Sequence, residues 1–137
     1  MAELIVDAGP IVAILDRREK FHGWASGQLM QLRQPLVTCD AVLTEAFYLL
    51  SRSSVSVAKL RDYLEKGLVV SRFDSMQNIQ RILDLMRIYQ NVPMSFADAC
   101  LVCMVEKDPG STLFTLDLDF TIYRQQRRRL IPLLAPF

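Results

Sequence analysis

The chain has 137 residues, of which 51% are hydrophobic and 23% are charged, and its formal net charge is +1. This composition excludes a disordered or fibrous chain and predicts a single domain over residues 1–137 with an ample core. The near-neutral charge gives no overall signature of nucleic-acid binding, so any basic binding surface must be local. We expect no membrane partner, because no stretch is long and apolar enough to span a bilayer, and no cleavable secretory segment is evident.

Short apolar runs alternate with helical patterns along the chain. The apolar runs predict strands over 4–6, 36–38, 68–70 and 111–116, with a fifth, edge strand over 130–131. The segments between them predict helices over about 10–15, 20–34, 40–51, 55–66, 76–89, 95–107 and 119–126. Because strands and helices alternate, we expect an α/β domain with a mostly parallel sheet.

Local signals mark several boundaries. Pro35 ends the second helix, and Gly67 ends the fourth. Asp74 or Ser75 is placed to cap the helix that follows the third strand. The third helix, over 40–51, is apolar nearly all round, which predicts that it is buried on every side.

Four separate segments carry an acid beside apolar residues. Asp7 follows the first strand, and Asp117 follows the fourth, with Asp119 two residues further on; Glu45 and Asp98 lie near the starts of the third and sixth helices. In a parallel sheet these positions all meet at the carboxyl edge, where α/β domains bind ligands. Converging acids repel one another, so a bound divalent cation is the natural compensation. The pattern predicts a metal-dependent phosphodiesterase.

Each acid also has a purely structural interpretation. Asp7 and Asp117 could cap the helices that follow them, and Asp98 fits a capping box with Ser95. Glu45 is harder to explain in this way, because its helical neighbours are apolar and a buried Glu needs a cationic partner. We favour one shared site over four independent structural roles. Two further acids, Asp40 and Asp74, are better explained as exposed caps.

The order and spacing of these motifs resemble the PIN-domain family of small metal-dependent ribonucleases, especially the VapC-type toxins of toxin–antitoxin pairs, over nearly the whole chain. The landmarks are Val6-Asp7-Ala8, the His22 segment, Leu43-Thr44-Glu45, Phe96-Ala97-Asp98-Ala99 and Thr115-Leu116-Asp117-Leu118-Asp119-Phe120. The resemblance implies a three-layer α/β/α sandwich around a mostly parallel sheet of four or five strands.

The resemblance also implies roles for particular residues. The acids at the family's catalytic positions are Asp7, Glu45, Asp98 and Asp117. The ligands for Mg²⁺ or Mn²⁺ would be Asp7, Asp98, Asp117 and Asp119, with Thr115 in support. RNA would be hydrolysed through a metal-activated water, which Glu45 could help to orient. A homodimer is implied as well and, for a toxin, a small VapB-like antitoxin partner.

Basic residues offer candidate contacts to the RNA backbone, although a solvated charged face is the simpler interpretation for any one of them. These candidates are Arg17, Arg18, Arg124, Arg127 and Arg128. The three cysteines do not form a disulfide framework, so a cytoplasmic location is expected. We interpret Cys100-x-x-Cys103 as buried core and His22 as packing between helices.

Two other readings of the acids remain. A receiver-type signalling domain also gathers acids at this edge, but it needs a Lys at the end of a late strand, and the late strands here offer Asp117 and arginines instead. A PIN-like module for RNA processing or protein binding is not separated from a toxin by sequence. A gene for a small DNA-binding protein immediately upstream would favour the toxin. The preferred metal, the RNA target and the oligomer size stay open.

Overall fold

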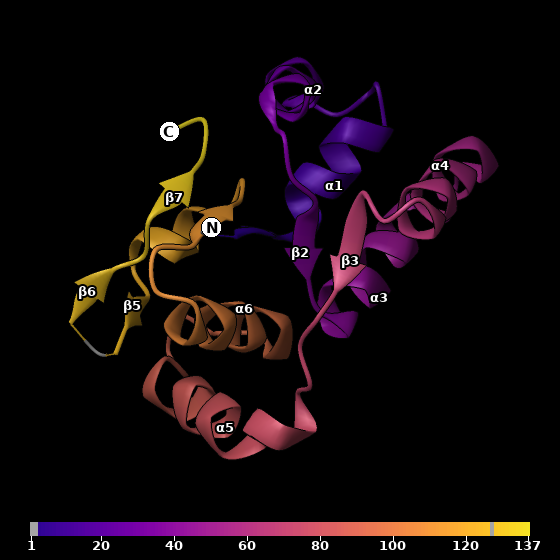
Figure 1. Ribbon diagram of the computed structural model, residues 1–137. Coiled ribbons are helices and arrows are strands. Elements are labelled where there is room, and N and C mark those ends of the chain that lie inside the picture. The colour runs from indigo at the N-terminus through magenta and orange to yellow at the C-terminus, as the bar shows by residue number, and fades with distance from the viewer. Residues whose placement is uncertain (1–2, 127) are drawn as a thin grey trace.

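The protein is described by a computed structural model that covers residues 3–126 and 128–137; Arg127, one of the expected RNA contacts, lies outside the described residues. Five parallel strands form the main sheet in the order β3-β2-β1-β4-β7 (Figure 1). Their bounds are β1 (Leu4–Val6), β2 (Leu36–Thr38), β3 (Val69–Ser71), β4 (Thr112–Phe114) and β7 (Leu133–Leu134). The expected parallel α/β sheet is confirmed.

Six α-helices connect these strands. They are α1 (Ala8–Leu15), α2 (His22–Gln31), α3 (Asp40–Leu50), α4 (Ser54–Glu65), α5 (Ile79–Ile88) and α6 (Phe96–Lys107). After β3 the chain returns across the sheet and adds β4 on the other side of β1. Right-handed crossovers change face when the direction of travel reverses, so α1–α4 and α5–α6 cover opposite faces. Figure 1 shows α2 and α6 on opposite sides of the strands. Within the described residues, no helix is long and apolar enough to cross a membrane.

The helix ends follow the local signals in the sequence. Ser95 caps α6, since its side chain accepts the N–H of Asp98 at 3.0 Å. Asp74 accepts the N–H groups of Met76 and Gln77 and so caps the 3₁₀ turn η1 (Met76–Asn78) that precedes α5. Gly67, just after α4, has a φ of 72°, which favours glycine and ends the helix.

The core lies between the sheet and its helices. Every residue of β1 is buried, as are most residues of α6, including Cys100 and Cys103, whose thiols are free. The interpretation of the Cys-x-x-Cys pair as core is therefore confirmed. His22 donates from Nδ1 to the carbonyl of Ala13 at 2.7 Å, which fastens the start of α2 to α1, as expected for a histidine packed between helices.

The C-terminal segment differs from the expected local structure. In place of a helix over 119–126, a 3₁₀ turn η2 (Leu118–Thr121) leads into a small antiparallel pair, β5 (Arg124–Gln125) with β6 (Arg129–Leu130). The fifth strand of the main sheet is β7, and not residues 130–131. The apolar run from Leu130 to Leu134 has no periodicity that indicates which of its residues pair with the sheet. The pairing is set by β4, where the backbone N–H of Leu113 donates to the carbonyl of Pro132.

Helix α3 was expected to be buried on every side, and this is wrong. Its side chains Val42, Ala46 and Leu50 are buried, but Tyr48 is 76% exposed and Leu49 is 51% exposed. An apolar helix can bury one face and still leave apolar side chains on the surface. Composition alone therefore did not distinguish a helix buried on one face from a helix buried on every side.

Candidate metal centre

Four of the predicted site acids line one cleft. β1 and β4 are neighbours at the point where the strand order reverses, and Asp7 and Asp117 follow these two strands. Asp98 enters from the first turn of α6 and Glu45 from α3. The cleft has a volume of about 760 Å³. Its lining consists of Asp7, Gly9, Glu45, Leu49, Ser95, Asp98, Leu116, Asp117 and Leu118.

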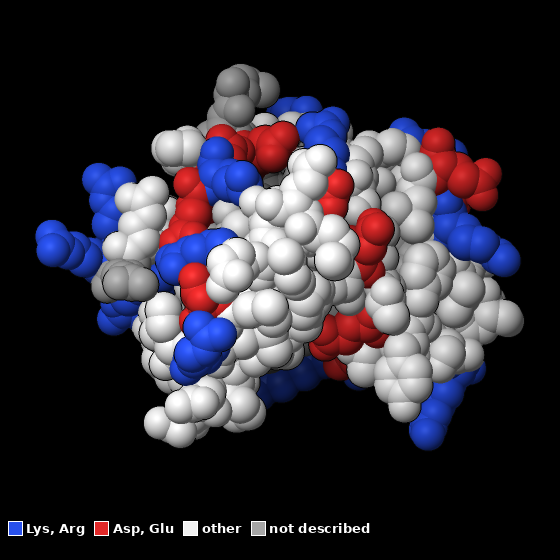
Figure 2. Space-filling view, turned by 90° about the horizontal axis from the view of Figure 1, so that it is seen from below, with Lys and Arg blue, Asp and Glu red and all other residues white. Residues whose placement is uncertain are grey.

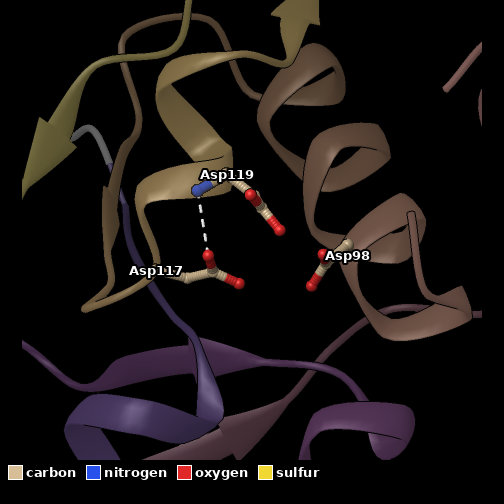
Figure 3. A group of neighbouring side chains, drawn as sticks. All are labelled: Asp98, Asp117 and Asp119. Carbon is tan, nitrogen blue, oxygen red and sulfur yellow. Dashed lines mark hydrogen bonds between the residues drawn. The ribbon is translucent and has the colours of Figure 1, made fainter. Parts of the chain in front are cut away.

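Three carboxylates converge most closely in this region. Asp98, Asp117 and Asp119 each offer an oxygen that lies within 4.8 Å of the other two. Figure 3 shows the three side chains facing a common space, Asp98 from α6 and the other two from the segment after β4. The backbone N–H of Asp119 donates to Oδ1 of Asp117 at 2.9 Å, which fixes one carboxylate against the next turn of chain. The arrangement presents oxygen donors from two separate elements to one point.

Asp7 is the buried member of the site. Its side chain accepts the N–H of Ala8 at 2.8 Å and the hydroxyl of Thr115 at 2.9 Å, and the residue is only 8% exposed. The Thr115 oxygen in turn accepts the N–H of Asp117 at 3.0 Å. Thr115 therefore ties the end of β1 to the end of β4. Asp7 caps α1 and also lines the cleft, so the capping and shared-site interpretations are both compatible with its position.

The electrostatics of the cleft are unfavourable without a cation. Burial raises the pKa of Asp7 to about 7, and the neighbouring charges of Asp98 and Glu45 act in the same direction. Burial also raises the pKa of Asp98 to about 6, with a further contribution from Asp117. Within residues 3–126 and 128–137, every Lys or Arg ion pair lies elsewhere in the molecule. Figure 2 shows acidic side chains near the middle of one face, bordered mostly by uncharged atoms.

Tyr123 is a contributor that the sequence did not reveal. Its hydroxyl donates to Oδ2 of Asp98 at 2.9 Å, and its ring is completely buried. The ring packs edge-on against Tyr89 and Phe120, with centroid distances of 5.1 Å to each. Burial and the Asp98 charge raise the pKa of the Tyr123 hydroxyl, so it remains a donor. Nothing in the sequence marked it, because it lay inside a segment predicted to be helix.

The structure also tests the capping and buried-partner interpretations of Asp98, Glu45 and Asp40. Ser95 does cap the N–H of Asp98, but the Asp98 carboxylate bonds to Tyr123 in place of completing a capping box. Glu45 is exposed on the rim of the cleft, as are its neighbours Tyr48 and Leu49, so it needs no cationic partner to offset burial. Asp40 is exposed as expected, but its role as a cap is wrong, because Cys39 stands at the N-cap position of α3 and the Asp40 carboxylate accepts a hydrogen bond from Ser71.

The structure does not bring the described candidate arginines to the acidic cleft. Arg124 donates from Nη1 to the carbonyls of residues 121, 122 and 123 and lines a different cleft beside Tyr89. Arg128 is exposed near the turn between β5 and β6. Arg17 and Arg18 line a separate cleft at the end of α1.

The donor set fits a hard divalent cation. The three converging groups are all carboxylates, and neither a thiol nor an imidazole lines the cleft. Carboxylate oxygens are the ligands preferred by Mg²⁺ and Mn²⁺, whereas thiolates and imidazoles favour zinc and other transition metals. A dication would also relieve the repulsion that the raised Asp7 and Asp98 pKa values express.

Comparison with known proteins agrees with this geometry. Among solved structures, the fold is similar to that of the Mycobacterium tuberculosis VapC20 toxin, described as cleaving the sarcin–ricin loop, with a TM-score of 0.76. The two chains share 18% sequence identity, over 88% of this chain and 94% of that one, so the likeness is one of fold. No curated protein matches the chain in sequence. The model of the PIN domain family matches residues 4–125. Because this match spans most of its length, the chain belongs to the PIN domain family.

Proposed function

We propose that this protein is an endoribonuclease that depends on Mg²⁺ or Mn²⁺, and that it is the toxin of a type II toxin–antitoxin pair. The observation that carries the proposal is the convergence of Asp98, Asp117 and Asp119, none of which forms an ion pair with a described Lys or Arg. This cluster lies at the strand-order switch of a PIN-family fold. The fold similarity to a toxin described as cleaving the sarcin–ricin loop supports the choice of substrate and of biological role.

The roles of the residues follow from their positions. Asp98, Asp117 and Asp119 would hold the cation, and Asp7 would supply the buried side of the site. When bound, the dication would lower the pKa of a coordinated water and neutralise charge that develops on the scissile phosphate. Glu45 stands on the exposed rim, from which it could accept a proton from the attacking water or orient it. No side-chain nucleophile is required.

Two neutral residues would position these acids. Thr115 fixes the Asp7 carboxylate and the Asp117 backbone with a single hydroxyl. Tyr123 holds one oxygen of Asp98 and leaves the other free to face the cluster. Groups of this kind orient metal ligands, and their loss typically weakens metal affinity or activity.

The direct test is an incubation of the purified protein with labelled RNA and DNA, with Mg²⁺, Mn²⁺ or EDTA. We expect cleavage of RNA with either metal and none with EDTA. The variant Asp98→Asn should abolish cleavage while its circular dichroism and thermal unfolding show an intact fold. Asp62→Asn is the matched control, because Asp62 is an exposed acid that pairs with Lys66 on α4, outside the cleft. Full activity in Asp98→Asn, or cleavage that persists in EDTA, would refute the assignment.

The toxin role requires a separate experiment. Induced expression of the chain in a bacterial host should arrest growth, and Asp98→Asn should not. Co-expression of a small protein encoded beside the gene should restore growth and should copurify with the chain. An active nuclease that leaves growth unaffected would support an RNA-processing role in place of a toxin.

The expected homodimer and cytoplasmic location belong to the same proposal. Exposed apolar side chains on α5, Leu83 and Ile88, offer surface that a second copy could cover. Light scattering coupled to size-exclusion chromatography measures the oligomer directly. A monomer at micromolar concentration would remove the dimer from the proposal and leave the nuclease chemistry untouched.

A further inference from the structure

A second cleft, of about 620 Å³, lies between the end of α1 and the start of α4. Its charged side chains are four cations and one carboxylate, which gives a local excess of three positive charges in a chain whose net charge is +1. They are Arg17, Arg18, Arg52, Lys59 and Asp16. So concentrated a positive charge in one concave surface attracts an anion.

Most of these cations are available to a ligand. Arg18 is engaged by Asp16, with Nε and Nη2 donating to the two carboxylate oxygens at 3.1 and 3.2 Å. Arg17, Arg52 and Lys59 are exposed and form no ion pair with any described residue. These three residues therefore line the cleft without an ion-pair partner in the part of the chain that the structure describes.

The backbone adds to this positive character. Ser53 caps α4 by accepting the N–H of Ser56 at 3.2 Å. Ser54 and Val55 also line the cleft, and their backbone N–H groups have no intrahelical acceptor because they belong to the first turn of α4. The amino end of a helix carries a partial positive charge that favours phosphate groups.

The walls of the cleft are fixed to each other. The Ser56 hydroxyl donates to the carbonyl of Leu15 at 2.8 Å, and this bond is buried. It joins the start of α4 to the last residue of α1. The cleft is therefore held in place by a buried contact before any ligand arrives, which lowers the cost of binding.

The basic cleft adjoins the acidic one along two helices. On α1, Gly9 lines the acidic cleft and Leu15 the basic cleft, and these residues are separated by about 9 Å along the helix axis. On the second wall, Leu49 lines the acidic cleft and Arg52, three residues later, lines the basic one. Tyr48, which precedes Leu49, is exposed and offers a ring on which a base could stack.

We propose that the basic cleft binds backbone phosphates of the RNA substrate, one at each of its three available cations, a few nucleotides away from the bond that is cleaved at the acidic cleft. This inference rests on the proposed ribonuclease function. Arg17, Arg52 and Lys59 supply the contacts, and the exposed side of α3 near Tyr48 and Leu49 carries the strand between the clefts. The cleft contributes to substrate affinity and register and takes no part in the bond-breaking step.

The test is RNA binding by the full chain in EDTA, measured by fluorescence anisotropy of a labelled 12-nucleotide RNA over a range of salt concentrations. In the triple variant Arg17→Gln, Arg52→Gln, Lys59→Gln, the slope of log K against log salt should become shallower by about 2, since each phosphate contact to a single strand contributes about 0.7. The control is Arg33→Gln, Lys66→Gln, Arg87→Gln, which removes three exposed cations outside this cleft and should keep the wild-type slope. If the triple variant does not fold, as judged by circular dichroism, Arg52→Gln alone should reduce the slope by about 0.7.

Cleavage kinetics separate this inference from the function on which it rests. With a long RNA and Mg²⁺, the triple variant should show a raised KM and an unchanged kcat, whereas a dinucleotide too short to reach the basic cleft should be cleaved equally by both proteins. If the wild type cleaves no RNA, the proposed function fails while the salt slope still reports on the cleft. If the wild type cleaves RNA but the triple variant keeps the wild-type slope and KM, the phosphate site is overturned. Loss of affinity for an acidic peptide with RNA binding intact would likewise overturn it.

Discussion

Replacement of Asp7 by Asn should stabilise the metal-free protein at neutral pH. Burial raises the pKa of Asp7 from 3.8 to about 7, a difference of about three units. At 1.36 kcal/mol per unit, ionisation of this side chain in the folded state costs about 4 kcal/mol relative to the unfolded chain. Asn keeps an oxygen for the Ala8 N–H and removes the charge, so the variant avoids most of this cost.

The sign of the pH dependence follows from which state binds the proton more tightly. The folded protein holds the Asp7 proton up to about pH 7, whereas the unfolded chain releases it near pH 3.8. The contribution of Asp7 to the free energy of unfolding is therefore fully present below pH 3.8 and is lost as the pH rises to about 7. In Asp7→Asn this contribution is absent, so its unfolding free energy should change less over the same range.

Urea unfolding in EDTA, from pH 4 to pH 8.5, measures the effect. We expect the difference in unfolding free energy between Asp7→Asn and wild type to grow by up to about 4 kcal/mol in favour of the variant across this range. Comparison of the two proteins at each pH cancels the titration of groups that they share, such as Asp98. If the unfolding free energies of the two proteins change in parallel with pH, or if the variant is less stable than wild type at pH 8.5, the buried charge of Asp7 does not destabilise the folded protein.

Three further substitutions test individual contacts. Tyr123→Phe should raise the Mg²⁺ concentration for half-maximal activity by about tenfold with little change in kcat at saturation, because Asp98 loses its orienting hydrogen bond. A titration of RNA cleavage with Mg²⁺ measures both quantities. Thr115→Val should lower the free energy of unfolding by about 1–3 kcal/mol in urea titrations, since it leaves the Asp117 N–H without its partner. Arg81→Gln should lower the free energy of unfolding by about 3 kcal/mol in the same assay, because the largely buried Glu106 loses its cationic partner, and RNA cleavage should not change. A loss near zero would mean that this ion pair is as weak as an exposed one.

The positions of the acids along the chain were enough to predict where they would meet. Asp7 and Asp117 follow apolar runs that can only be buried strands, and any parallel arrangement sends the ends of such strands to one edge. Asp98 was placed by Ser95, which marks the start of α6 by local capping chemistry. These are short-range signals, and the structure agrees with each of them.

Other features depended on contacts between segments that are distant in sequence. Tyr123 reaches Asp98 only because the chain after η2 turns back beside α6, and no local pattern encodes this turn. Glu45 was judged by its apolar neighbours, yet whether Tyr48 and Leu49 face the core or solvent is decided by what packs against α3.

The sequence by itself determined the alternation of strands and helices, the parallel sheet and the set of acids at its carboxyl edge, because propensity, capping and hydrophobic pattern act over a few residues. Only the tertiary structure decided that β7 and not residues 130–131 completes the sheet, and that the Tyr123 hydroxyl holds Asp98. It also decided that Arg17, Arg52 and Lys59, which form no ion pair with a described residue, share a second cleft. Hydrogen bonds and charge clusters between remote segments depend on how the elements pack, and packing is a property of the whole chain.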